Sequence, residues 1–228
     1  MTDICDECGQ EFEKIGRHWG TFESHRPSLS NESLDMLTGV LMGDGTLNKG
    51  PKNAYVDIKM TTPDYLEYIH GKIGDESLGV KHVATPEELA ARNRKRGFRP
   101  NADAKDYSHA YQLKTRCNPQ LNRFRSWYCP NKVWPADIEL TPTVLKHLYC
   151  CDGHWDTHDS HSEISIAALN EQGNKEKINS YFSNVGLPTP DRYESRKSNF
   201  IFAWNVDGTQ ELFEYMGEPL PGFGYKFP

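Results

Sequence analysis

The stretch from Leu37 to Gly45, LTGVLMGDG, decides the fold that we expect for this chain. It predicts an apolar helix whose last turn carries one carboxylate, Asp44, between two glycines. The carboxyl end of a helix bears roughly half a negative elementary charge, so a carboxylate there is disfavoured by about 0.3–1 kcal/mol unless a cation offsets it. A metal ion would supply that cation, and Asp44 is therefore a candidate metal ligand.

A second copy of the pattern occurs at residues 145–153, LKHLYCCDG, where another apolar helix is predicted to end at Asp152. Gly39 and Gly43 are four residues apart on the first helix, so they share one face and let a partner helix approach to backbone contact. The second helix is the natural partner. We therefore predict that the two helices pack together and that Asp44 and Asp152 lie side by side at their ends.

Length and composition are those of a globular protein. The chain has 228 residues, enough for one large domain or two small ones. It contains no apolar run of about 18 residues, and its start, MTDICDEC, is unlike a signal peptide. We therefore expect a protein without membrane segments, located in the cytoplasm or nucleoid of a prokaryotic cell.

The amino-terminal segment carries a Cys-x2-Cys-x9-His-x6-His pattern formed by Cys5, Cys8, His18 and His25. Cysteines in a cytosolic protein are more typical of thiols or metal ligands than of disulfides. A tetrahedral zinc ion needs four such ligands, and it would stabilise a segment too short to fold on its own core. The spacing thus predicts a zinc knuckle, and the alternative is a disordered acidic arm.

Charge is distributed unevenly along the chain. The formal net charge of −6, taken alone, argues against a nucleic-acid partner, because phosphate neutralisation favours basic domains. Basic residues are nevertheless concentrated between Arg92 and Lys132. A strand predicted at residues 110–116 places Gln112 and Lys114 on one face, together with Arg116. These residue types contact phosphates and base edges in the major groove, so this face predicts DNA binding.

The remaining pattern repeats after residue 31. In the first part we expect a polar turn at 48–53, a strand at 55–60, a helix after Thr62, a strand at 77–83, a polar loop at 84–108, the strand at 110–116 and a helix at 119–129. In the second part we expect the motif helix from about Thr143, strands at 162–169, 190–196 and 199–206, and helices at 171–186 and 207–217. Similar element order in both parts indicates an internal duplication.

The two phrases LTGVLMGDG and LKHLYCCDG resemble the paired motifs of the LAGLIDADG homing endonucleases, and the resemblance extends over roughly residues 31–228. The segment QLKTRCNPQLNRFRSWYCPNKVWP resembles the family segment that leads through a helix to a lysine, here Lys132. Lys226, after PLPGFGY, resembles the corresponding lysine of the second half. The second motif departs from the pattern at His147 and Cys151, where the helix interface usually has small residues.

The resemblance implies an α+β fold with duplicated αββαββα halves that form a pseudo-twofold saddle of antiparallel sheets. The expected domains are the zinc-knuckle-like segment at 1–27, a first half at 28–136 and a second half at 137–228. Such a chain is a single-chain pseudo-dimer, and we expect a monomer.

The resemblance also implies site-specific cleavage of double-stranded DNA. Asp44 and Asp152 would bind divalent metal, Mg²⁺ or Mn²⁺, because carboxylate oxygens suit hard cations. Lys132 and Lys226 would polarise the attacking water or stabilise charge in the transition state. The expected DNA contacts are the polar and basic side chains of the sheets and of the basic loop: Lys59, Arg92, Arg94, Lys95, Arg96, Arg99, Gln112, Lys114, Arg116, Arg192, Arg196 and Lys197.

Two other functions remain open at this point. The same fold occurs in a catalytically inactive nucleic-acid-binding protein or an intron RNA maturase, although a pure binder would not require both carboxylates and both lysines. A zinc-dependent protein built around Cys5 and Cys8 would leave the duplicated helices without an explanation.

Overall fold

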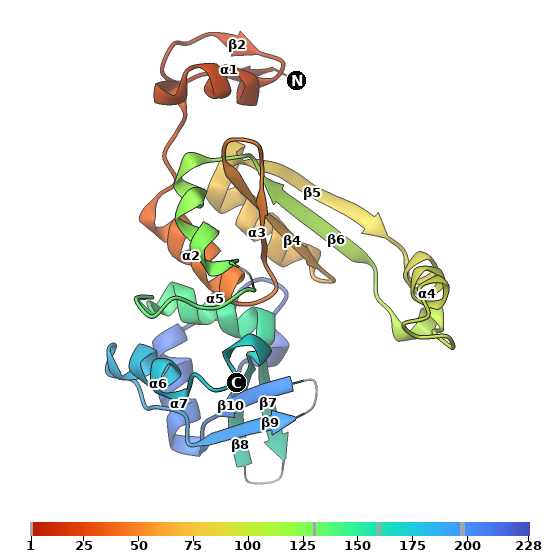
Figure 1. The fold of residues 1–228 in the computed structure, drawn as a ribbon, viewed down its shortest axis with the longest axis vertical. Helices are drawn as coiled ribbons and strands as arrows, with labels where there is room; N and C mark the ends of the chain where they lie inside the picture. Colours follow the sequence, from red (N-terminus) through yellow and green to blue (C-terminus); the bar gives the residue numbers. More distant parts are fainter. Residues whose placement is uncertain (1, 130, 159–160, 197–198) are drawn as a thin grey trace. The chain divides into compact units, whose positions relative to one another are not determined.

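The computed structural model describes residues 2–129, 131–158, 161–196 and 199–228 (Figure 1). The chain forms two compact units, Met1–Ser30 and Asn31–Pro228. In the described part of the chain, no helix combines the length and the apolar character that crossing a bilayer requires.

The first unit is a small segment with very little core. Its elements are β1 (Asp3–Ile4), β2 (Glu11–Phe12), α1 (Ile15–Thr21) and the 3-10 turn η1 (Glu23–His25). The two strands pair antiparallel, and the buried cluster consists of Cys5, Ile15 and Trp19 with Phe12 packed against it. A cluster of this size buries too little apolar surface to hold a fold by itself, so a metal cross-link would contribute directly to its stability.

Helices α2 (Asn31–Met42) and α5 (Pro142–Asp152) are in direct contact at the centre of the second unit (Figure 1). A Cβ atom added at Gly39 would lie 2.3 Å from the carbonyl oxygen of Val144. One added at Gly43 would lie 2.3 Å from a side-chain atom of α5. The predicted pairing of the two motif helices is confirmed, and it depends on residues without a side chain.

His147 stands on the α5 side of this interface, where a small residue was expected. Its Nδ1 lies 2.6 Å from the hydroxyl of Tyr65 in α3 (Pro63–Ile73), and its ring stacks on Tyr68. Burial lowers the pKa of His147 to about 3, so the ring is neutral at physiological pH and the hydrogen bond satisfies it. The bulkier residue therefore packs against α3, and the close approach is provided by the glycines of α2.

The first half contains a four-stranded antiparallel sheet in the order β3-β4-β6-β5. Its strands are β3 (Thr46–Lys49), β4 (Ala54–Met60), β5 (Ser77–Ala84) and β6 (Ala110–Thr115). Val56, Ile58 and Leu113 are fully buried on one face. Lys59 pairs with Gln112 in the register of β4 and β6, so both side chains belong to the opposite, polar face.

The second half repeats this arrangement with the sheet order β7-β8-β10-β9. Its elements are β7 (Gly153–His158), β8 (His161–Ala167), η5 (Leu169–Glu171), α6 (Lys175–Ser183), β9 (Arg192–Arg196), β10 (Asn199–Ala203), α7 (Val206–Met216) and η6 (Gly224–Lys226). Each half thus places its strands in the order first, second, fourth, third. This shared order confirms the predicted duplication and the α+β fold.

Several elements differ from the sequence-based prediction. Strand β3 overlaps the expected polar turn at 48–53, and β7 was not expected at all. Both are edge strands with few apolar residues, and pairing with one neighbour supplies the hydrogen bonds that hold them. The segment at 119–129 forms a 3-10 helix, η4 (Pro119–Trp127), in place of an α-helix.

The expected loop at 84–108 contains helix α4 (Pro86–Lys95) and the 3-10 turn η3 (Ala104–Asp106). Thr85 and Glu88 form a capping box, with the Glu88 amide donating to the Thr85 hydroxyl and the Thr85 amide donating to the Glu88 carboxylate. The helix is polar almost all round, so its sequence shows no apolar stripe. Capping rather than amphipathicity was the signal for this helix.

Replacing Gly39 by alanine tests the close contact of α2 with α5. The added methyl would meet the backbone of α5, so we expect the free energy of unfolding to fall by about 1–3 kcal/mol in urea denaturation. Gly71, in the last turn of α3, is the matched control, because a Cβ there would meet nothing within 4 Å. Gly71→Ala should raise stability by up to about 1 kcal/mol. Equal stability of Gly39→Ala and wild type would contradict the packing described.

Candidate active site

Asp44 and Asp152 meet at the ends of the two central helices. Asp44 lies two residues after Met42, the last residue of α2, and Asp152 is the last residue of α5. A Cβ atom at Gly43 would lie 3.3 Å from Oδ2 of Asp152, so this carboxylate rests against the end of α2. The structure therefore brings together the two carboxylates that the sequence separates by more than a hundred residues.

The surroundings of the carboxylates favour their neutral forms. Burial, and secondarily the charge of Asp44, raises the pKa of Asp152 to about 6, against the opposing effect of Lys132 and Lys226. The Asp44 side chain reaches solvent, yet the surrounding helix ends displace enough water to raise the pKa of its carboxyl as well. Two partly desolvated carboxylates in one place form an oxygen-rich site that a divalent cation would stabilise.

Each helix end also binds a lysine. Lys132 Nζ donates to the carbonyl oxygens of Gly43 and Gly45, the latter at 3.4 Å. Lys226 Nζ donates to the carbonyl oxygens of Cys150, at 2.8 Å, and Gly153, at 2.7 Å. Lysines at the carboxyl end of a helix oppose the helix dipole. The cation that the sequence argument required at Asp44 is thus supplied at least in part by the chain itself.

The two lysines occupy related positions, because each binds two backbone carbonyls within two residues of its own aspartate. Burial lowers the pKa of both ammonium groups, while both carboxylates oppose that effect. An ammonium group has three N–H donors. Two of them are used on backbone carbonyls at each helix end, which leaves one for a further acceptor.

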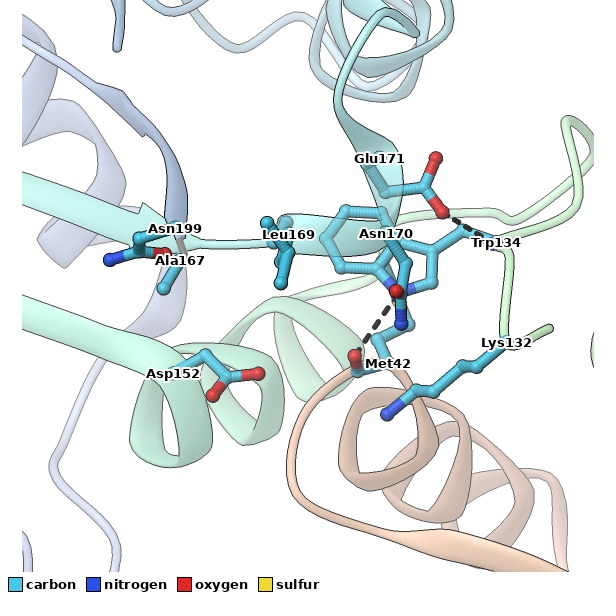
Figure 2. Close-up of a pocket in the computed structure, with 10 residues that line it drawn as sticks. Met42, Lys132, Trp134, Asp152, Ala167, Leu169, Asn170, Glu171 and Asn199 are labelled. Atoms are coloured by element: carbon cyan, nitrogen blue, oxygen red, sulfur yellow. Dashed lines mark hydrogen bonds between the residues drawn. The ribbon is translucent and has the colours of Figure 1, made fainter. Parts of the chain in front are cut away.

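A cavity of about 270 Å³ opens beside Asp152 and Lys132 (Figure 2). Its wall includes Asn170 and Asn199, two amide side chains that the sequence analysis did not single out. They follow β8 and begin β10, and no motif marks them. The cavity provides polar space next to Asp152 and Lys132.

The polar face of the first sheet contains an acid that the sequence analysis did not weigh. Gln112 Nε2 donates to Asp57 Oδ1 at 2.6 Å, and Lys114 Nζ lies 3.7 Å from Asp57 Oδ2. Arg116 Nε donates to the carbonyl oxygen of Asp75 at 2.7 Å. The structure confirms that Gln112 and Lys114 share a face, but Asp57 reduces its positive charge. Lys59, on the same face, is exposed.

The basic residues of α4 and the following turn do not have equal roles. Arg94 donates to the carbonyl oxygen of Ala102 and so holds the turn after α4. The other basic side chains of this segment are exposed, and within the described residues none of them has a hydrogen bond or ion pair: Arg92, Lys95, Arg96 and Arg99. Figure 1 shows α4 at the far end of the β5–β6 pair. This basic arm is free to contact an anionic partner.

The basic residues expected on the second sheet are less available. Arg192 forms ion pairs with Glu163 and Glu194, the latter at 2.8 Å. Arg196 ends β9, and its side chain lies outside the described part of the structure, as does Lys197. The described positive charge therefore comes mainly from the first half.

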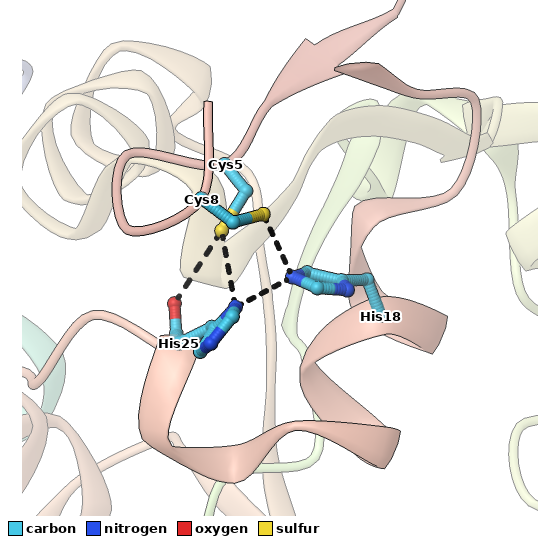
Figure 3. A group of neighbouring side chains, drawn as sticks. All are labelled: Cys5, Cys8, His18 and His25. Carbon is cyan, nitrogen blue, oxygen red and sulfur yellow. Dashed lines mark hydrogen bonds between the residues drawn. The ribbon is translucent and has the colours of Figure 1, made fainter. Parts of the chain in front are cut away.

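The four residues of the amino-terminal pattern converge on one point (Figure 3). One ligand atom from each of Cys5, Cys8, His18 and His25 lies within 4.8 Å of the other three. Cys8 Sγ is 3.6 Å from His18 Nε2, and Cys5 Sγ is 4.0 Å from His25 Nδ1. Zinc bonds of about 2.0–2.3 Å place tetrahedral ligands roughly 3.3–3.8 Å apart. The donor set therefore fits zinc, and these distances, with that of 3.1 Å between His18 Nε2 and His25 Nδ1, extend to either side of that range.

Comparisons with known proteins agree with this geometry. The sequence profile of the LAGLIDADG DNA endonuclease family matches residues 34–202. The structure is similar to that of the homing endonuclease I-WcaI bound to its DNA recognition sequence, with a TM-score of 0.71 and 13% identity over 100% of this chain and 99% of that chain. At that identity the likeness shows the fold. A search of curated proteins found no match.

Two further structures are similar over most of the chain at lower scores. I-GzeII in complex with its DNA target gives a TM-score of 0.49 with 10% identity, over 84% of this chain and 86% of that chain. I-DmoI in complex with DNA and Mn gives a TM-score of 0.47 with 12% identity, over 83% of this chain and 98% of that chain.

The raised pKa of Asp152 predicts a pH-dependent stability difference in metal-free protein. A carboxyl whose pKa is about 6 when folded and near 3.8 when unfolded destabilises the fold above pH 6, and this cost disappears as the pH falls towards 4. Asp152→Asn should therefore unfold at a higher temperature than wild type at pH 7.5 in EDTA, by a free energy on the order of 1 kcal/mol. The difference should shrink at pH 4.5. A difference independent of pH would contradict the assigned cause.

Proposed function

The chain belongs to the LAGLIDADG DNA endonuclease family, and from that premise we propose that it cuts double-stranded DNA at a specific site with divalent metal held by Asp44 and Asp152. The observation that carries this proposal is the meeting of two carboxylates at adjoining helix ends, each with its own lysine. That arrangement supplies one reaction centre for each DNA strand.

The residues of each centre have separate tasks. Asp44 and Asp152 would hold the cations, whose chemistry is to lower the pKa of a bound water and to neutralise charge on the scissile phosphate. Lys132 and Lys226 would direct their remaining N–H donor at the attacking water or at the phosphate oxygen, where negative charge increases in the transition state. The helix backbones fix both lysines, so little reorganisation is needed during the reaction.

The catalytically inactive alternatives, a DNA-binding protein or an intron RNA maturase, are less well supported. Binding alone requires positive charge and shape, and neither is improved by placing two carboxylates where phosphates would approach. Both aspartates, and both lysines that touch their helix ends, are in place. The complete set is what hydrolysis requires.

We place the DNA against the polar face of the first sheet, the corresponding face of the second, and the basic arm formed by α4 and the turn up to Arg99. Both sheets belong to one chain, so a monomer would present two half-sites in the manner of a pseudo-dimer. The arm would contact phosphates outside the central site, because its cations are exposed and have no acidic neighbours between Arg92 and Arg99.

We also propose that Cys5, Cys8, His18 and His25 bind a structural zinc ion. Four ligands from protein side chains complete a closed tetrahedral site, and closed sites are structural rather than catalytic. The core of the first unit is very small, so metal binding would contribute directly to the stability of the segment.

Asparagine substitutions test the reaction centres. A library of randomised DNA duplexes in a plasmid is incubated with wild-type protein and Mg²⁺ or Mn²⁺, and the cut ends are sequenced to identify the target. On that target, Asp44→Asn and Asp152→Asn should each reduce double-strand cleavage at least about 100-fold, because a neutral amide is a poor ligand for a hard cation. DNA affinity measured in Ca²⁺ should stay within about threefold. Full cleavage by both variants would refute the assignment.

Replacing Arg92 and Arg96 together by alanine tests the basic arm. If both guanidinium groups neutralise phosphates, the slope of log affinity against log salt should become shallower by about 2. Lys72→Ala is the matched control, because Lys72 lies on α3, is paired with Glu32 on α2, and is outside the proposed interface. An unchanged slope in the double variant would exclude the arm from the interface.

Elemental analysis tests the zinc site. Purified wild-type protein should contain about one zinc ion per chain, and Cys8→Ser combined with His25→Ala should contain almost none, because two of four ligands are lost. Cys117→Ser, which removes an exposed cysteine outside the cluster, is the control and should keep its zinc. Wild-type protein without zinc after expression in zinc-supplemented medium would contradict the proposal.

A further inference from the structure

The segment that carries Lys132 is hydrogen-bonded to the second half of the protein. Two residues after Lys132, the backbone of Trp134 is bound on both sides. Its N–H donates to Glu171 Oε1 at 2.6 Å, and its carbonyl oxygen accepts from Lys177 Nζ at 2.7 Å (Figure 2 shows the Glu171 contact). Glu171 belongs to η5 and Lys177 to α6, so neither comes from the first half, which contains Lys132 and Trp134.

Glu171 and Lys177 form a buried ion pair. Their charged atoms are 2.5 Å apart, and Glu171 is fully buried. The oxygen of Glu171 that pairs with Lys177, Oε2, also accepts from Asn174 Nδ2 at 3.0 Å. A buried ion pair is a poor source of stability compared with an apolar pair of the same size, but it fixes the position of whatever it binds. Here it binds both backbone polar atoms of one residue, Trp134.

Trp134 transmits this position to the end of α2. Its Nε1 donates to the carbonyl oxygen of Met42 at 3.1 Å, next to the carbonyls that accept from Lys132 Nζ. Tyr181, also from α6, donates to the carbonyl oxygen of Pro135 at 2.5 Å. The second half thus holds the chain on the carboxyl side of Lys132, and the indole joins that chain to the helix end.

The position of Lys226 depends on different contacts, which lie within its own half. Its carbonyl oxygen accepts from the hydroxyl of Tyr149 at 2.6 Å, and the next residue, Phe227, packs its ring against Tyr149 at 5.4 Å. Tyr149 lies on α5, the helix that Lys226 itself caps. The two lysines are therefore placed by contacts that share no residue.

We propose that Glu171 and Lys177 are positioning residues that place Lys132, and that they thereby control cleavage of one DNA strand separately from the other. The inference rests on the proposed function of the two lysines. It goes beyond that function because it makes the second half responsible for the reaction centre of the first.

Strand-resolved cleavage tests the proposal. A duplex carrying the target identified by the cleavage selection is labelled with a different dye on each strand, and both cleavage rates are measured in Mg²⁺. Lys132→Met and Lys226→Met first show which strand depends on which lysine. Glu171→Gln, which keeps an acceptor for the Trp134 amide but loses the ion pair, should slow the Lys132-dependent strand by about 10- to 100-fold. The other strand should stay within about threefold, so nicked duplex accumulates.

Reciprocal and matched variants separate positioning from general damage. Tyr149→Phe removes the hydroxyl that binds Lys226 and should slow the opposite strand. Glu32→Gln removes an exposed ion pair with Lys72 and should change neither rate. Lys177→Met replaces the cation by an apolar side chain and gives a second route to the same defect if Glu171→Gln folds poorly. Equal slowing of both strands, or slowing of the Lys226-dependent strand by Glu171→Gln, would overturn the proposal.

A second measurement does not depend on cleavage. Lysine side chains are labelled by reductive ¹³C-methylation, and the Lys132 signal is assigned from its loss in Lys132→Met. In Glu171→Gln this signal should move towards the position of a free lysine while the Lys226 signal stays in place. An unchanged Lys132 signal would refute the positioning role. A different result would separate the two roles. If Lys132→Met affected both strands equally while the Lys132 signal still moved in Glu171→Gln, the catalytic role of Lys132 would be refuted and the positioning role would stand.

Discussion

The close approach of α2 to α5 is the contact on which the rest of the structure depends. It places the backbone of one helix against the backbone of the other at Gly39, where even a methyl group would collide with the carbonyl oxygen of Val144. A wider separation would move Asp152 away from the end of α2, where its carboxylate now lies beside Gly43. Two half-sites would then be separate, and the oxygen-rich site between them would be lost. The absence of side chains at Gly39 and Gly43 therefore allows the two carboxylates to meet.

The same contact concentrates negative charge, and the chain partly neutralises it. Two carboxylates and the carboxyl ends of two helices meet in a partly buried space, which is why burial raises the pKa of Asp152 to about 6. Lys132 and Lys226 bind the helix carbonyls and oppose that shift. What remains is an unfavourable arrangement in the metal-free protein. Strain of this kind is typical of functional sites, where a ligand or substrate relieves it.

The two halves share a topology but not their details. Both sheets have the strand order first, second, fourth, third. In the first half, helix α4 and its basic arm lie between β5 and β6. In the second half, only residues 197 and 198 separate β9 from β10. His147 makes the helix interface unequal, and the lysines are anchored by different residues. The two halves thus share a framework, and each half has its own contacts to its lysine.

The sequence by itself determined the framework of this protein. Two apolar helices ending in aspartate, glycines four apart, and alternation in residues 55–60 and 110–116 depend on local periodicity, which is visible in any single chain. The cysteine and histidine spacing also identified the four residues that converge in the first unit. Tertiary structure alone decided what those patterns do not encode. Asp57 accepts a hydrogen bond from Gln112 and lies beside Lys114. Arg94 donates to a carbonyl oxygen of the turn after α4. Glu171 and Lys177 bind the backbone of Trp134. Such contacts link residues far apart in the chain, and pairing of charges and hydrogen bonds between them depends on distances that only the packed fold establishes.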